Sequence, residues 1–208
     1  MEKEYLYWLC RLSCLGAVSI RQLYEHFQSF KIIYNIEENA LERTNILKKS
    51  QKEALIKWRQ YLPECQQEYH KLAERKIRFV TPWDADYPKR LLEIYDYPMG
   101  IFVKGRLPQE EKPSIAVVGA RGCSAYGERL AEEFSRALAS QKVQVISGLA
   151  IGIDGAAHRG AIRAGGATFG VLGCGVDICY PSSNYSLYEA MEDTGGILSE
   201  FPLRSRPQ

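Results

Sequence analysis

Three glycine-rich segments, each directly after a short apolar run, hold the residues whose types and spacing could do chemistry. These segments span residues 119–127, 147–154 and 173–181, and Arg121 lies within the first of them. Glycine loops that lead into helix N-termini expose backbone N–H groups to anions, and a guanidinium presents a fork that fits a phosphate. The pattern therefore predicts a phosphate-binding edge. A purely structural pairing of Arg121 with a nearby carboxylate is the alternative.

Four residues in or just after these segments are expected to be structural: Gly152, Asp154, His158 and Asp177. Asp154 opens a predicted helix, where the helix dipole stabilises a carboxylate. His158 follows four residues later on the same helical face, within reach of a hydrogen bond to Asp154. No nucleophile lies beside the pair, so we expect a structural clasp rather than an acid/base pair. Asp177 is expected to fix its own turn.

Enzymatic use of these loops is not indicated. A dinucleotide enzyme places Asp or Glu at the tip of the second strand, where this sequence has Ser147, and neither G-x-G-x-x-G nor a Walker motif is present. The six cysteines have no metal-ligand spacing, and we expect them to be reduced and mostly buried. The sequence thus predicts no catalysis, no cofactor and no metal.

Alternating strand and helix patterns from residue 114 onward must position the three loops. This alternation is typical of a parallel sheet with crossover helices, and strands this apolar are expected to be buried on both faces. Loops at the carboxyl ends of such strands form the usual ligand site. The predicted strands are 115–118, 143–146, 168–172 and 197–199, and the predicted helices are 127–140, 153–164 and 185–192.

Three regions are predicted along the chain. Residues 1–62 show helical periodicity, residues 63–112 form a connector with short strands at 77–80 and 100–105, and residues 113–208 form the α/β domain. The net charge is +2 overall, but the α/β region has 8 basic and 9 acidic residues. Phosphates must therefore be bound by local groups. No apolar stretch of 18 residues or more is present, so we expect no membrane span and a cytoplasmic location.

The three segments read V-V-G-A-R-x-x-S-x-Y-G, S-G-L-A-x-G-I-D-x-x-A-H-x-G-A-I and G-V-L-G-C-G-V-D-x-x-Y-P. In this order they resemble the DNA-processing protein A (DprA/Smf) family. The resemblance implies an extended Rossmann-like domain behind a small helical (SAM/helix-hairpin-helix-like) domain. It also implies a non-enzymatic protein of natural transformation, a homodimer that binds and protects incoming single-stranded DNA and loads the RecA recombinase onto it.

In this family the glycine-rich loops and the G-x-R arginine hold the DNA phosphates. Carried onto this sequence, the DNA-binding residues are Gly119, Arg121, Ser124, Ser147, Gly148, Gly173 and Tyr180. Ser124 fits equally well as a helix N-cap, and Tyr180 as a packed loop residue rather than a stacking platform. The family continues into an F-P-x-R-N-R motif, further strands and a G-S-x-T loop. We therefore expect the sheet to be incomplete at the C-terminus, without several DNA contacts and much of the dimer interface.

Two alternatives remain open. The cytokinin-activating (LOG-like) phosphoribohydrolases share an extended Rossmann architecture and cleave nucleoside monophosphates. Their P-G-G-x-G-T-x-x-E signature is not found here, although its expected place lies past residue 208. The G-I-D-x-x-A-H run and the helical region favour the DNA-binding family. A module that retains only a protein-interaction role is the other alternative.

Overall fold

A six-stranded mixed sheet forms the centre of the computed structural model, which describes residues 2–207. The strand order is β1-β2-β6-β5-β4-β3. Neighbours among β3 to β6 pair in parallel, whereas β1 pairs with β2, and β2 with β6, in antiparallel register. This confirms the predicted α/β class and parallel sheet. The strands are β1 (Ile77–Val80), β2 (Ile101–Gly105), β3 (Ser114–Ala116), β4 (Gln144–Ser147), β5 (Thr168–Val171) and β6 (Gly196–Ser199).

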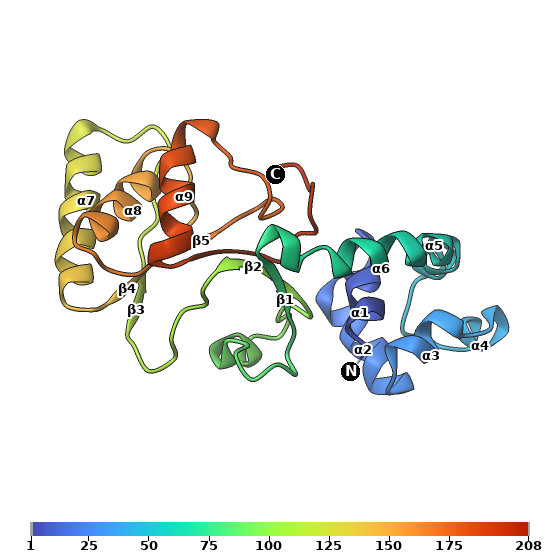
Figure 1. Ribbon diagram of the computed structural model, residues 1–208. Coiled ribbons are helices and arrows are strands. Elements are labelled where there is room, and N and C mark those ends of the chain that lie inside the picture. The colour runs from blue at the N-terminus through green and yellow to red at the C-terminus, as the bar shows by residue number, and fades with distance from the viewer. Residues whose placement is uncertain (1, 208) are drawn as a thin grey trace.

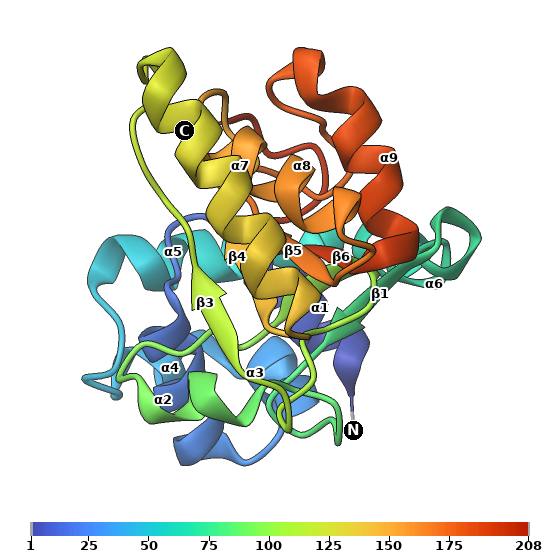
Figure 2. The ribbon, with the colours of Figure 1, turned by 90° about the vertical axis from the view of Figure 1, so that its left-hand side faces the viewer.

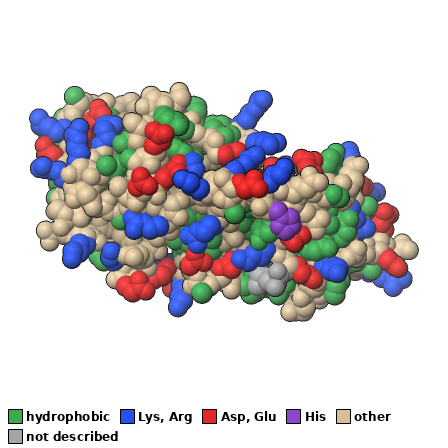
Figure 3. Space-filling model, in the orientation of Figure 1, with side chains coloured by type: hydrophobic (Ala, Val, Ile, Leu, Met, Phe, Trp, Pro, Cys, Tyr) green, Lys and Arg blue, Asp and Glu red, His purple; other side chains and the backbone are tan. Residues whose placement is uncertain are grey.

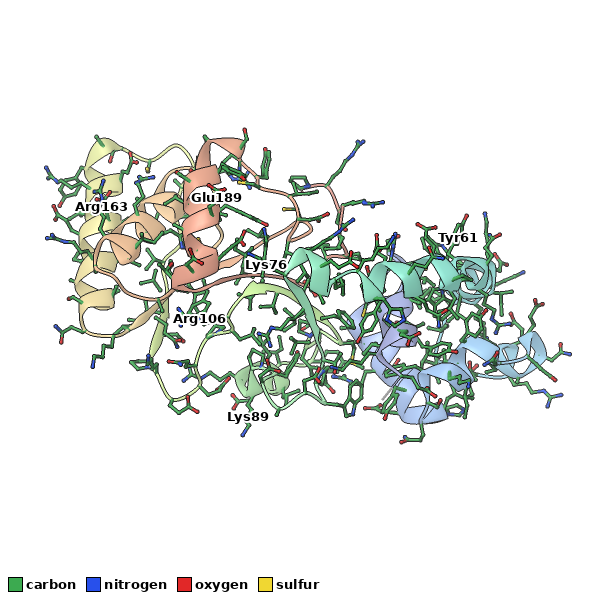
Figure 4. All side chains as sticks on the ribbon, in the orientation of Figure 1. Tyr61, Lys76, Lys89, Arg106, Arg163 and Glu189 are labelled. Atoms are coloured by element: carbon green, nitrogen blue, oxygen red, sulfur yellow. The ribbon has the colours of Figure 1, made fainter. Side chains whose placement is uncertain are left out.

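Three helices cover one face of the sheet, as Figures 1 and 2 show: α7 (Ala125–Ser140), α8 (Ile153–Arg163) and α9 (Tyr185–Thr194). They share a face because the strands β3, β4, β5 and β6 follow one another in a single direction across the sheet. On the outer side of this helical layer Arg163 forms an ion pair with Glu132 of α7 (Figure 4). On the other face, Tyr87 and Leu91 pack against Phe169 and Leu198.

Strand β3 departs from the expected burial. The sequence predicted strands buried on both faces, but Ile115 is 43% exposed and Val118, just beyond the strand, is 72% exposed. Among the described residues β3 pairs with β4 alone, so it forms an edge of the sheet. An apolar run therefore does not by itself show that both faces of a strand are covered.

Short helices form the N-terminal part around α1 (Lys3–Cys10), whose Leu6, Tyr7, Trp8 and Leu9 are completely buried. A helix buried on all sides is the centre of a bundle. Around it lie α2 (Ala17–Phe27), α3 (Phe30–Asn35), α4 (Glu38–Glu42), α5 (Lys49–Trp58), α6 (Leu62–His70) and the 3₁₀ turns η1 (Arg59–Tyr61) and η2 (Ala73–Arg75). Helix α6 continues this part past residue 62, and the division into separate domains stays a prediction.

Aromatic contacts join the helical part to the sheet. The Tyr7 ring meets Phe79 of β1 at 5.5 Å and Phe102 of β2 at 5.7 Å, both edge to face. Lys3 forms an ion pair with Asp84 at 2.6 Å. Because one hydrophobic core runs through both parts, the helices are held in a fixed position against the sheet.

Free thiols and charges are scattered over the fold. All six cysteines are free, but only Cys65 and Cys174 are buried, so the expectation of mostly buried thiols was wrong.

Within residues 2–207 no cluster of His, Cys, Asp and Glu could hold a metal ion, and no helix is long and apolar enough to cross a membrane. Basic and acidic side chains are interspersed over the face seen in Figure 3.

Candidate nucleic-acid interface

The three glycine-rich loops meet at a recess of about 190 Å³ at the carboxyl ends of the parallel strands. Each loop contributes to its lining, as expected for loops that follow neighbouring parallel strands. Four of the seven residues predicted to bind DNA line this recess: Arg121, Gly148, Gly173 and Tyr180. The structure therefore brings together one cation, two glycine backbones and one aromatic ring.

Arg121 is exposed at this recess. Within the part of the chain that the structure describes, no carboxylate or carbonyl pairs with its guanidinium. The structural alternative, a pairing with a nearby carboxylate, is thus not found. An unpaired guanidinium at a glycine loop keeps all five of its N–H donors available for an anion.

Gly152 allows the backbone of the second loop to lie directly against that of the first. Its φ is +80°, and a Cβ at this position would lie 2.4 Å from the carbonyl oxygen of Ala120 and 2.7 Å from that of Arg121. Ile153 lies against Gly119, where an added Cβ would approach the Ile153 side chain to 2.7 Å. Gly119 and Gly152 therefore set the distance between the loops, and neither lines the recess.

Two predicted contact residues form hydrogen bonds that stabilise the fold. Ser124 is the N-cap of α7, where its Oγ accepts a hydrogen bond from the Gly127 N–H at 3.1 Å, which confirms the capping alternative. Ser147 is buried and donates its hydroxyl hydrogen to the Val117 carbonyl at 2.6 Å. That bond ties β4 to the end of β3 and turns Ser147 away from the recess.

The expected clasp between Asp154 and His158 was wrong. Asp154 Oδ2 accepts a hydrogen bond from the Gly148 N–H at 3.1 Å, across the second loop. His158 Nδ1 pairs with the hydroxyl of Thr168 on β5 at 2.7 Å. Since the Thr168 hydroxyl donates to the Val145 carbonyl at 3.0 Å, it accepts from His158. Both residues are structural, as expected, but each holds a different part of the fold.

The third loop is tied to the C-terminal segment. Asp177 Oδ1 accepts a hydrogen bond from the backbone N–H of Arg204 at 2.9 Å, so its structural role reaches beyond its own turn. Tyr180 is 53% exposed beside the recess, which leaves ring surface open to a ligand.

Asn184 is a functional support that the sequence did not indicate. Its buried side-chain amide donates to the carbonyls of Leu149 at 2.9 Å and Ala150 at 3.1 Å, and so fixes the second loop from the far side. The signal was its place directly before a helix, in a Pro-Ser-Ser-Asn turn. That position is typical of a local cap, however, and the long-range partners could not be read from it.

Comparison with known proteins shows which proteins the chain is similar to. The model of the family described as DNA recombination-mediator protein A matches residues 78–208. Protein Smf of Synechocystis sp. is 34% identical over 219 residues, covering 100% of this chain and 53% of the relative. DNA processing protein DprA of Streptococcus pneumoniae is 41% identical over 124 residues, covering 60% of this chain and 44% of the relative.

Solved structures show the same fold. The X-ray structure of DNA processing protein A from S. pneumoniae matches with a TM-score of 0.78 and 28% identity, over 99% of this chain and 70% of that one. A structure of DNA processing protein A from Helicobacter pylori, whose subject is its single-stranded DNA binding mode, matches with a TM-score of 0.55 and 25% identity, over 63% and 59%. The chain spans about half the length of the curated relatives it matches.

The family match takes in β2 to β6, all of β1 except its first residue, and all three loops of the recess, and it covers more than half of the chain. The chain therefore belongs to the DNA recombination-mediator protein A family.

Proposed function

We propose that this chain binds single-stranded DNA at the recess where its three glycine-rich loops meet, without marked sequence preference. The observation that carries the proposal is the exposed, unpaired guanidinium of Arg121 beside the backbone of Gly173. Gly148 also lines the recess, but its N–H already donates to Asp154. A phosphate can accept hydrogen bonds from both kinds of donor. Tyr180 offers its exposed ring to a neighbouring base, and every base has a face that can stack.

The relatives support a wider role around this contact. Family membership favours a function in DNA processing during natural transformation, and the H. pylori relative is described by its single-stranded DNA binding mode. We propose in addition that the protein protects incoming DNA and loads the RecA recombinase onto it. We also propose that it is a homodimer located in the cytoplasm.

The lining of the recess gives little support to a phosphoribohydrolase. Among the described residues that line it, none is an acid, a histidine or a lysine. The Cys174 thiol is buried, which raises its pKa, so it is protonated near neutral pH and a poor nucleophile. A hydrolase needs a group that activates water or the leaving group. Release of ribose phosphate from a nucleoside monophosphate by the purified chain would favour the enzyme instead.

Replacing Arg121 with alanine should weaken binding to single-stranded DNA by a similar factor for every sequence. Loss of one phosphate contact should lower the slope of log affinity against log salt by about 0.7. Fluorescence anisotropy with oligothymidine and a mixed sequence, over a series of salt concentrations, measures both quantities. Lys142→Ala is the matched control, because Lys142 is an exposed cation that precedes β4, at the opposite end of the strands.

An unchanged salt slope and an unchanged affinity of Arg121→Ala would show that the DNA lies elsewhere. Equal losses in Arg121→Ala and Lys142→Ala would show that binding follows the overall charge rather than the recess.

A further inference from the structure

A second and larger cavity, of about 600 Å³, lies between the helical part and the C-terminal segment. One wall is the turn from α1 to α2, and the opposite wall is residues 200–206. The first wall is fixed to the sheet through the contacts of Tyr7 with Phe79 and Phe102. The second wall is held by hydrogen bonds from the Gly175 N–H to Ser205 and from the Arg204 N–H to Asp177. The cavity is therefore a lasting feature of the junction between the two parts.

Arg204 and Arg206 give this cavity its charge. Both line it, both are exposed, and within residues 2–207 neither guanidinium has a hydrogen-bond or ion-pair partner. Arg11 also lines the cavity but is neutralised by Glu68, to which it is ion-paired. Glu200 is the one acidic side chain among the described lining residues. Two free cations thus face one carboxylate, which leaves a local positive excess.

The two cavities share one wall. Pro207 lines the first recess, while Arg204 and Arg206, directly before it, line the second. This wall is fixed to the third glycine loop, because Ser205 accepts a hydrogen bond from the Gly175 N–H at 3.0 Å and Asp177 holds the Arg204 N–H. A chain that passes over Pro207 leaves one cavity and enters the other.

We propose that single-stranded DNA bound at the glycine loops continues over residues 204–207, so that Arg204 and Arg206 hold its phosphates at the mouth of the second cavity. This inference rests on the proposed function and extends it to the helical part, which forms the far wall. Trp58 and Phe201 also line the cavity and give it apolar surface next to the cations. A groove that combines cations for the backbone with aromatic surface for the bases is the common design for single-strand binding.

The positions of individual cations decide where a polyanion binds, because the α/β region has no general positive field. It carries 8 basic and 9 acidic residues, and charges of both signs alternate over the face in Figure 3. The attraction of a polyanion to a surface of this kind depends on where a few unpaired cations lie. Arg121, Arg204 and Arg206 are three such cations along one continuous path.

The test uses the 208-residue chain with two oligothymidines of about 4 and about 16 nucleotides, the limits of the usual site size of one single-strand-binding module. The variant Arg204→Gln/Arg206→Gln keeps much of the length of both side chains and removes both charges. Lys112→Gln/Lys142→Gln is the matched control, since it removes two exposed cations that precede β3 and β4, away from both cavities. Thermal unfolding checks that each variant is folded.

We expect the arginine variant to bind the long oligothymidine more weakly, with a salt slope lower by about 1.4 for two lost phosphate contacts. Between about 50 and about 200 mM salt, its disadvantage should therefore shrink by roughly sevenfold. Its affinity for the short oligothymidine should fall less, because the glycine loops can hold a short strand that does not reach both arginines. The lysine control should behave as the unaltered chain with both probes.

Failure of the extension and failure of the proposed function are distinguishable. If the unaltered chain binds both oligothymidines and the arginine variant matches it in affinity and slope, the path over residues 204–207 is wrong and the recess remains the site. If the unaltered chain binds neither, the proposed function itself is wrong for this chain. Equal losses for the short and the long probe would also overturn the extension, because they would place the two arginines in the first recess.

Discussion

Replacing Gly152 with alanine is expected to lower both the stability of the chain and its affinity for single-stranded DNA. The φ of +80° at this position is a conformation that side chains disfavour by about 1–3 kcal/mol. The added Cβ would also lie 2.4 Å from the Ala120 carbonyl oxygen and 2.7 Å from that of Arg121. Since both oxygens belong to backbone, relief must move the loop that carries the Arg121 guanidinium.

We expect a decrease of roughly 2 kcal/mol or more in the free energy of unfolding, measured by urea denaturation. The affinity for oligothymidine should fall in the same variant. Gly165→Ala is the matched control for strain alone, because its φ is +66° and no atom lies within 4 Å of its added Cβ. Gly122→Ala is a control within the Arg121 loop itself, because no atom lies within 4 Å of its added Cβ. Both controls should keep full DNA binding, and a Gly152→Ala chain that also keeps it would show that this contact does not position Arg121.

The sheet and the meeting of the loops could be predicted from the sequence because both follow from local patterns. Apolar runs that alternate with amphipathic helices leave few topologies, and parallel strands place their following loops at one edge. The pairing of β2 with β6 could not be predicted. The register that sets Phe102 opposite Ser199 joins segments far apart in the chain, and it depends on how the connector packs rather than on its own sequence.

The candidate site shows the same limit at the level of single side chains. Ser147 ends β4 and Arg121 lies in the loop after β3, yet Ser147 turns inward to the Val117 carbonyl and Arg121 remains free. Spacing placed His158 one helical turn from Asp154, but the nearest partners of both side chains come from other elements. A sequence shows which side chains can form hydrogen bonds, whereas the backbone groups and distant residues that satisfy them appear only in the fold.

Acid is expected to destabilise this chain through His158, which is completely buried between α8 and β5. Burial lowers its pKa from 6.5 to about 4, because the protonated ring would lose its hydration. In the unfolded chain the ring takes up a proton below about pH 6.5. The contribution of the neutral histidine is therefore complete above that pH and is lost as the pH falls toward 4. The loss amounts to roughly 3 kcal/mol.

Carboxylates titrate in the same range, so a matched variant must isolate the histidine. His158→Asn keeps a side-chain N–H that can donate to the Thr168 hydroxyl but has no proton to gain. Its stability at about pH 7 should be lower, since the smaller side chain leaves part of the ring's space empty. Between about pH 6.5 and about pH 4, however, urea denaturation should show a decline smaller by about 3 kcal/mol than that of the unaltered chain. Parallel pH profiles for the two chains would mean that His158 takes up its proton at the same pH in the folded as in the unfolded chain, and that its burial does not lower its pKa.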